Sequence, residues 1–331
     1  MREKILALLH GKKKVDTQPA FSGLIHVTAE GLASEGLAFN EICTDALKMA
    51  SAAASTFKLT GMPSAALPLD LCAPAEMLGA ELRYYPEEEF RFPQVGKVQF
   101  ESTEEITTEN TNSTEILEMG RARLICDAIQ LVKQDVGKDI VISGMLPGPF
   151  TLLLYVCRPK NVFIEIKKNP EAVSTALFHL SSFLAKVGQA YLNAGADFIT
   201  LHEMGGSPGF IGPKPFESHI LPALQKLTGE LPRPSVISVC GKTDAALSLL
   251  TQTGADAVSI DQMTDLTAAR AVLKGTLLFG NLDPVRTLSA GDKAEVVEDV
   301  QRAKEAGVDA VWPGCDLVVQ TPTENLKAIR L

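Results

Sequence analysis

The sequence predicts an α/β fold, a (β/α)8 barrel of the TIM type, and the main reason is a repeated segment. Three times a helix end, a glycine, an aspartate and a short apolar strand follow one another, at residues 194–201, 253–260 and 306–312. These strands lack the alternation of apolar and polar residues, which is typical of parallel strands buried on both faces. Stretches with helical periodicity lie between them. Strands that alternate with helices in this way favour a closed barrel.

The alternation extends along most of the chain. We expect strands at 19–25, 64–69, 139–144, 197–202, 235–240, 256–260, 276–280 and 309–312. We expect helices at 170–193, 216–230, 244–251, 266–273 and 294–306, the first of them capped by Asn169 with Pro170 in its first turn. A doubly wound open sheet is the structural alternative. No Gly-x-Gly-x-x-Gly motif follows the first strand, so a dinucleotide-binding fold is disfavoured.

Two regions depart from this alternation within what we expect to be a single domain over residues 1–331. Residues 1–60 are predicted to be helical apart from the first strand and to cap the bottom of the barrel. Residues 80–115, which follow the second strand, contain two short runs suited to strands and then a polar stretch from 101 to 115. This pattern predicts an inserted β-hairpin followed by a solvated loop.

The charge and the apolar content exclude several classes of partner. The 331 residues include 31 basic and 40 acidic side chains, a net charge of −9, whereas a phosphate-binding surface needs a basic excess, so we expect no nucleic-acid partner. No apolar run reaches the ~18 residues of a membrane helix, and residues 1–10 do not read as a secretory signal. We therefore expect a cytoplasmic protein with no membrane contact, whose six scattered cysteines are reduced.

Two of these cysteines stand where chemistry is expected. Cys240 closes the apolar run 235–240, and Cys315 follows the last predicted strand. In a β/α barrel the loops after the strands converge on one mouth, which carries the active site. Two sulfur ligands at this mouth indicate a metal site that is open to a substrate. The alternative is that each cysteine is a small buried hydrophobic residue.

Several motifs resemble the uroporphyrinogen decarboxylase superfamily over nearly the whole chain. They are Gly148-Pro-Phe-Thr-Leu152, Gly280-Asn-Leu-Asp-Pro284, Gly195-Ala-Asp197, and Asp70 followed by Ala75-Glu-Met-Leu-Gly79. The resemblance implies a TIM-type barrel with its active site at the C-terminal mouth. True uroporphyrinogen decarboxylases grip the carboxylates of a tetrapyrrole with an arginine-rich segment after the first strand. The matching residues 21–28 contain no arginine, so this decarboxylase activity is kept only as the alternative.

The second branch of the superfamily consists of zinc-dependent methyltransferases that take a methyl group from a methylated corrinoid protein, such as the methylcobamide:coenzyme M methyltransferases. Their signature is His-x-Cys at the end of one strand and a distant Cys at the end of the last. Cys240 and Cys315 match the two cysteines, but Ser238 stands where the family has histidine. His202, at the end of the preceding strand, is our expected third zinc ligand. A role of His202 in binding substrate or orienting Glu203 is the alternative.

A carboxylate is expected as the fourth zinc ligand, because it can leave the metal and let an acceptor thiol take its place. Glu203 follows His202 directly, and Asp261 ends the next strand but one, near the position where the family has a displaceable acidic ligand. The catalytic residues expected are thus Cys240, Cys315, His202, Glu203 and Asp261.

The resemblance also implies substrates and partners. The chain has no Asp-x-His-x-x-Gly motif, so the methylcorrinoid is expected to come from a corrinoid-carrier protein. Gly205, Gly206 and Ser207 could let this bulky cofactor approach the backbone, with Asp70 and His26 also at the mouth. The methyl acceptor is expected to be a small molecule, either a thiol such as coenzyme M or homocysteine, or tetrahydrofolate. A barrel that binds a corrinoid without catalysis is the remaining alternative.

Overall fold

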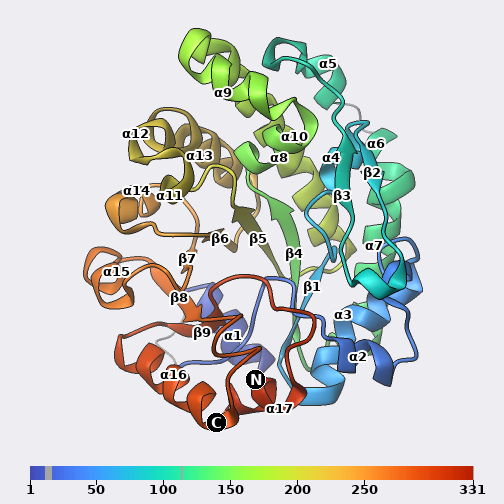
Figure 1. The fold of residues 1–331 in the computed structure, drawn as a ribbon, viewed down its shortest axis with the longest axis vertical. Coiled ribbons are helices and arrows are strands. Elements are labelled where there is room, and N and C mark those ends of the chain that lie inside the picture. Colours follow the sequence, from blue (N-terminus) through green and yellow to red (C-terminus); the bar gives the residue numbers. More distant parts are fainter. Residues whose placement is uncertain (12–16, 113–114, 331) are drawn as a thin grey trace.

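The computed structural model describes residues 1–11, 17–112 and 115–330, and its centre is a curled sheet of seven parallel strands (Figure 1). The strands follow the order β1-β4-β5-β6-β7-β8-β9. Their bounds are β1 (Ser64–Leu67), β4 (Val141–Pro147), β5 (Phe198–Glu203), β6 (Ser235–Val239), β7 (Ala257–Ile260), β8 (Leu277–Leu282) and β9 (Ala310–Pro313). The predicted α/β barrel class is therefore confirmed.

Helices surround this sheet, as Figure 1 shows. Their bounds are α1 (Arg2–Leu9), α2 (Ala29–Ser34), α3 (Ala46–Thr60), α4 (Ala73–Met77), α5 (Thr108–Thr111), α6 (Glu115–Glu118), α7 (Gly120–Asp135), α8 (Pro149–Val156), α9 (Pro159–Lys168), α10 (Pro170–Ala194), α11 (Pro208–Ile211), α12 (Pro213–Pro215), α13 (Leu221–Glu230), α14 (Leu247–Leu250), α15 (Leu266–Val272), α16 (Lys293–Glu305) and α17 (Thr323–Ala328). The long predicted helix is confirmed as α10, and the side chain of Asn169 caps it by accepting from the N–H of Ala172. Of the helices described, none is long and apolar enough to cross a membrane.

The prediction of a first strand over residues 19–25 is wrong. This segment forms only an isolated parallel bridge, from Ala20 to β9. The Ser22 hydroxyl accepts a hydrogen bond from the N–H two residues later, and such local bonds compete with strand pairing. A Cβ on Gly23 would lie only 2.2 Å from a side chain of β5, so the segment runs through the packed interior. It still touches both edges of the sheet, because the N–H of Ser22 also donates to Ser64 in β1.

The region after β1 contains the predicted hairpin, formed by the antiparallel strands β2 (Glu81–Arg83) and β3 (Gln94–Lys97). The prediction that the polar stretch 101–115 is a solvated loop is wrong for much of its described part. A 3-10 turn, η3 (Thr103–Glu105), and helix α5 form there, and each begins with a capping box, from Ser102 and Thr107 respectively. These reciprocal side-chain bonds satisfy the free N–H groups of a helix start, so short helices form in a polar sequence. Residues 113–114 of this stretch lie outside the described part.

The amino-terminal part of the barrel interior is filled by a layer of side chains from the strands and from the segment 19–25, and α1 packs beneath it. The members of this layer are Phe21, Leu24, Val141, Phe198, Val236, Ala257, Phe279, Ala310 and Trp312. Ile5, Leu8 and Leu9 of α1 belong to the same cluster, so α1 seals the amino-terminal end of the barrel. Successive residues of a strand face opposite sides of the sheet. Phe198 faces the barrel interior, so His202, four residues later in β5, faces inward as well, and Glu203 faces outward.

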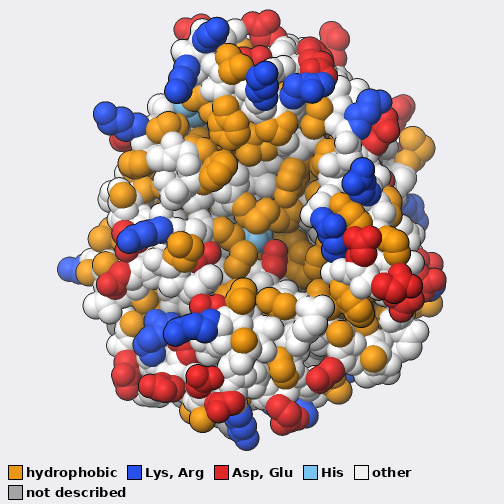
Figure 2. Space-filling view, viewed as in Figure 1, with side chains coloured by type: hydrophobic (Ala, Val, Ile, Leu, Met, Phe, Trp, Pro, Cys, Tyr) orange, Lys and Arg blue, Asp and Glu red, His pale blue; other side chains and the backbone are white. Residues whose placement is uncertain are grey.

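The opposite, carboxyl-terminal end opens into a cleft between the barrel and the β2–β3 hairpin, with a cavity volume of about 670 Å³. Figure 2 shows the hollow in this face, with hydrophobic side chains gathered around it. Its lining is largely apolar and aromatic, including Ile25, Leu71, Phe92, Leu154 and Tyr155. The charged lining residues are Asp70, Arg91 and Asp316. A cleft of this kind suits a small organic ligand.

Candidate metal centre

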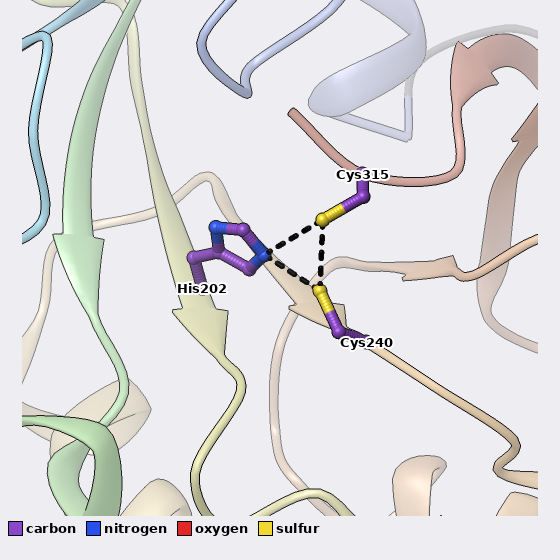
Figure 3. A group of neighbouring side chains, drawn as sticks. All are labelled: His202, Cys240 and Cys315. Carbon is purple, nitrogen blue, oxygen red and sulfur yellow. Dashed lines mark hydrogen bonds between the residues drawn. The ribbon is translucent and has the colours of Figure 1, made fainter. Parts of the chain in front are cut away.

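Three side chains converge at the carboxyl-terminal end of the barrel: His202, Cys240 and Cys315 (Figure 3). His202 Nε2 lies 2.9 Å from Cys240 Sγ and 3.8 Å from Cys315 Sγ, and the two sulfur atoms are 3.1 Å apart. Among the described residues this is the group of histidine, cysteine and acidic side chains whose ligand atoms all lie within 4.8 Å of one another. The structure thus brings together the two cysteines and the histidine that the sequence singled out.

The strand framework explains this convergence. His202 is the penultimate residue of β5, and Cys240 directly follows β6, so both side chains face inward at the end of a strand. Two glycines allow the turns beside the sulfur atoms. Gly241 has a φ of 80°, which favours glycine, and a Cβ on Gly314 would lie 2.6 Å from the backbone of Gln262.

The close approach of the thiols separates their pKa values. The hydrogen bond between the two thiols, together with His202, holds the pKa of Cys315 well below its usual range, while the same bond and burial raise the pKa of Cys240. Two sulfur atoms 3.1 Å apart share a proton, which favours a single negative charge on the pair. Burial lowers the pKa of His202, but the charges of Asp316 and Cys315 outweigh this effect and raise it to about 9.

Asp316 belongs to this centre, although the sequence did not identify it as a site residue. Its Oδ2 atom lies 3.6 Å from Nδ1 of His202, the ring nitrogen that faces away from the sulfur atoms. Its Oδ1 atom accepts a hydrogen bond of 2.9 Å from the N–H of Ile25. Burial raises the pKa of Asp316 to about 6, although His202 opposes the rise. Its position directly after Cys315 was the signal available in the sequence.

Glu203, which was predicted as a catalytic residue and as a possible ligand, faces away from the centre and lies outside the group of three. Its outward-facing carboxylate is fully buried and accepts hydrogen bonds from the N–H groups of Phe150, Thr151 and Gly206 at 2.9–3.1 Å, and from the Thr151 hydroxyl. These donors belong to the start of α8 and to the loop after β5. Glu203 therefore fastens the loop that follows His202 to the neighbouring helix.

Asp261, the other predicted carboxylate ligand, directly follows β7 and lies beside the centre but outside the group of three. Its Oδ2 atom accepts from the N–H of Gly241 at 2.9 Å, and its Oδ1 atom accepts from Met263 at 2.8 Å. Burial raises the pKa of this carboxyl group. In this arrangement Asp261 holds the turn that follows Cys240.

The loop Gly205–Ser207, which was predicted to let a cofactor approach, is closely packed on its protein side, and Gly205 is partly exposed. A Cβ on Gly205 would lie 2.7 Å from Leu154, and one on Gly206 would lie 2.9 Å from Phe150. The Ser207 side chain is buried and donates to the carbonyl of Cys240. The two glycines are thus needed for close packing, and Ser207 supports the turn that bears Cys240.

The two remaining predicted cofactor residues, His26 and Asp70, are held by the protein itself. The His26 ring is buried, with its nitrogens 2.6 and 2.9 Å from the carbonyl oxygens of Leu24 and Ser64. Asp70 forms a buried ion pair with Arg121 and accepts from the N–H of Cys72 at 3.0 Å. Asp70 still lines the cleft. The contacts of His26 with Leu24 and Ser64 hold the segment that precedes α2 against β1.

A helix-covered barrel with two thiols and an imidazole at the carboxyl ends of its strands defines an enzyme-like barrel with a candidate metal site at its mouth. The sequence model of the family described as Uroporphyrinogen decarboxylase (URO-D) matches residues 1–330. The chain belongs to this family, and the predicted resemblance is confirmed.

Comparisons with individual proteins distinguish the branches of the family. The methylcobamide:CoM methyltransferase MtbA of Methanosarcina acetivorans is 30% identical over 319 residues, which are 96% of this chain and 92% of that protein. The methylcobamide:CoM methyltransferase MtaA of Methanosarcina barkeri is 27% identical and covers 99% of this chain and 96% of its own length. A uroporphyrinogen decarboxylase of Citrifermentans bemidjiense is 26% identical over 74% of this chain and 71% of its own length.

The solved structure of a methyltransferase from Methanosarcina mazei has the same fold. It superposes with a TM-score of 0.92 and 26% sequence identity, over 99% of this chain and 96% of that chain. The methyltransferases thus match over a larger share of the chain than the decarboxylase does.

Proposed function

We propose that the protein is a corrinoid-dependent methyltransferase. It moves a methyl group between a methylated corrinoid, held by a carrier protein, and a small thiol bound at a zinc ion. The observation that carries this proposal is the convergence of His202, Cys240 and Cys315 at the barrel mouth. The relatives named methylcobamide:CoM methyltransferases support the corrinoid donor and a thiol acceptor.

The three side chains fit a zinc ion by chemistry and by spacing. Two thiols and an imidazole are ligands that zinc prefers, whereas magnesium and calcium prefer oxygen. Ligand atoms about 2.0–2.3 Å from a tetrahedral zinc ion are about 3.5–3.8 Å apart. The observed separations of 2.9, 3.1 and 3.8 Å need only small side-chain adjustments to reach these values. Three protein ligands leave one position for a substrate, and Asp261 is our proposed occupant before the acceptor arrives.

Each part of the mouth has a defined task in this reaction. A bound zinc ion would lower the pKa of the acceptor thiol, so that it is a thiolate at neutral pH. His202, Cys240 and Cys315 would hold the ion at a fixed point, and the cleft beside Asp316 would hold the rest of the acceptor. A sulfur–carbon bond forms as the cobalt–carbon bond breaks, and the electron pair of the broken bond stays with cobalt.

The lining of the cleft disfavours the decarboxylase alternative. Among the described residues that line it, Arg91 is the one basic side chain. A tetrapyrrole with many carboxylates would need several arginine partners, because such recognition depends on charge-assisted hydrogen bonds. The cleft suits a small acceptor better than a polyanion.

Zinc content and methyl transfer test the proposal together. Protein purified without chelator is expected to hold about one zinc per chain and to demethylate methylcobalamin in the presence of a thiol from a panel that includes coenzyme M and homocysteine. Cys240→Ala and Cys315→Ala should lose both properties. Cys126→Ser, a half-buried cysteine in α7, is the matched control and should keep both. Full transfer without zinc, or in both alanine variants, would contradict the proposal.

A further inference from the structure

The histidine of the metal centre stands one strand away from its position in the family signature. In the parallel pairing of β5 with β6, His202 lies directly opposite Ser238. Both residues face the interior, so a ring that starts from β5 reaches the same sulfur atoms as a ring from β6 would. The Ser238 hydroxyl is buried and has no hydrogen-bond partner, so Ser238 takes no polar part in the centre.

A histidine in this position needs its own support, because its ring can rotate and its proton can sit on either nitrogen. Nε2 faces Cys240 and Cys315, whereas Nδ1 is buried and has no hydrogen-bond partner in the structure. The carboxylate of Asp316 is 3.6 Å from this Nδ1 atom, slightly beyond hydrogen-bond length.

We propose that Asp316 is a positioning residue, which accepts a hydrogen bond from the Nδ1–H group of His202 and so presents Nε2 to the metal. This inference deepens the proposed function and rests on it only for the identity of the ion as zinc. Metal-bound histidines usually donate their second N–H to a carboxylate, which fixes the tautomer and makes the ligand more basic.

Two contacts hold Asp316 in place for this task. Its backbone is fixed because Cys315, the preceding residue, is itself a ligand. Its other oxygen accepts a hydrogen bond from the N–H of Ile25, which belongs to the segment 19–25 that contacts both β9 and β1. Asp316 therefore links the ligand on β5 to the ligand after β9. Asp316 also lines the cleft and its side chain is 26% exposed, so direct contact with the acceptor is the rival role.

A double-mutant cycle on metal affinity tests this inference without substrate, corrinoid or turnover. Metal-free wild type, Asp316→Ala, His202→Ala and the double variant are titrated with Zn²⁺ against a competing chelator. If Asp316 acts through His202, Asp316→Ala alone should weaken zinc binding by about 10–100-fold. The same change should have almost no effect in the His202→Ala background, because the interaction it removes is already absent.

Two further variants separate positioning from folding and from acceptor binding. Asp316→Asn keeps an oxygen acceptor for Ile25 but loses the charge, so it should give an intermediate loss of zinc affinity and a changed visible spectrum of the Co²⁺-substituted protein. Asp283→Asn, at the end of β8, keeps its turn hydrogen bonds and should bind zinc as the wild type does.

Unchanged zinc affinity and an unchanged Co²⁺ spectrum in Asp316→Ala would overturn the inference and leave only a role in acceptor binding. An equal loss in both backgrounds would also overturn it, because Asp316 would then act independently of His202. A protein that binds zinc in the expected pattern but transfers no methyl group would refute the proposed function and leave this inference standing.

Discussion

The position of the third metal ligand gives the sharpest prediction, because the strand register allows it to be moved. His202→Ala removes one of the three protein ligands. Four-ligand zinc sites contribute roughly 10–16 kcal/mol at neutral pH, so one ligand is worth about 3 kcal/mol, or about two orders of magnitude in Kd. We therefore expect His202→Ala to bind zinc about 100-fold more weakly than the wild type.

Placing the histidine on the neighbouring strand should restore much of this loss. Position 238 lies opposite position 202, and the space that the imidazole leaves in His202→Ala is available to a new ring. Replacing Ser238 breaks no hydrogen bond, because its hydroxyl has no partner. The double variant His202→Ala/Ser238→His should recover zinc affinity to within about tenfold of the wild type, because it again has three ligands but lacks the support of Asp316.

Competition with a chromophoric chelator measures both affinities, and circular dichroism checks that each variant is folded. His219→Ala, a half-buried histidine beside Ser174, is the matched control and should bind zinc normally. The reasoning is refuted if His202→Ala binds zinc as tightly as the wild type, or if adding Ser238→His brings no gain.

Three further predictions concern the thiols and the buried charges around the centre. In metal-free protein at neutral pH, iodoacetamide should modify Cys315, whose pKa is lowered, before Cys72, whose pKa burial raises to about 12; peptide mass spectrometry gives the order, and faster labelling of Cys72 would contradict it. Glu203→Ala should lower the free energy of unfolding by about 3 kcal/mol, because it leaves several buried N–H groups without an acceptor. Urea denaturation measures this loss, and a change near zero would refute the role of Glu203 in holding the loop. Arg121→Met should cost about 3–5 kcal/mol by leaving Asp70 buried without its partner. Adding Asp70→Asn should recover part of that loss in the same denaturation assay, and no recovery would argue against the ion pair.

The repeated segments carried most of the fold prediction. Each combines a helix end, a glycine turn and an apolar strand, and these local signals correctly predicted β5, β7 and β9. The segment over 19–25 has a similar apolar character but fails as a strand, because Ser22 forms a local hydrogen bond and Gly23 passes close to β5. The contact of Gly23 with β5 joins segments far apart in the chain, so it leaves no local trace in the sequence.

The part of the candidate site that depends on strand ends and on residue chemistry could be predicted from the sequence. Cys240, Cys315 and His202 each follow or end an apolar strand, and parallel strands bring such positions to one mouth. The alternation of side chains along β5 would also have placed Glu203 outward, opposite to its neighbour His202. Applying this alternation to the sequence would have removed Glu203 from the predicted ligands.

The family, the barrel class and the role of the two cysteines could be predicted from the sequence alone, because they depend on local patterns and on the order of elements. The register that sets His202 opposite Ser238 and the approach of Asp316 to the far side of the imidazole ring became visible only in the folded sheet. Both depend on how strands distant in the chain align in the closed sheet. A distance between two side chains is fixed by that alignment, and neither residue encodes it alone.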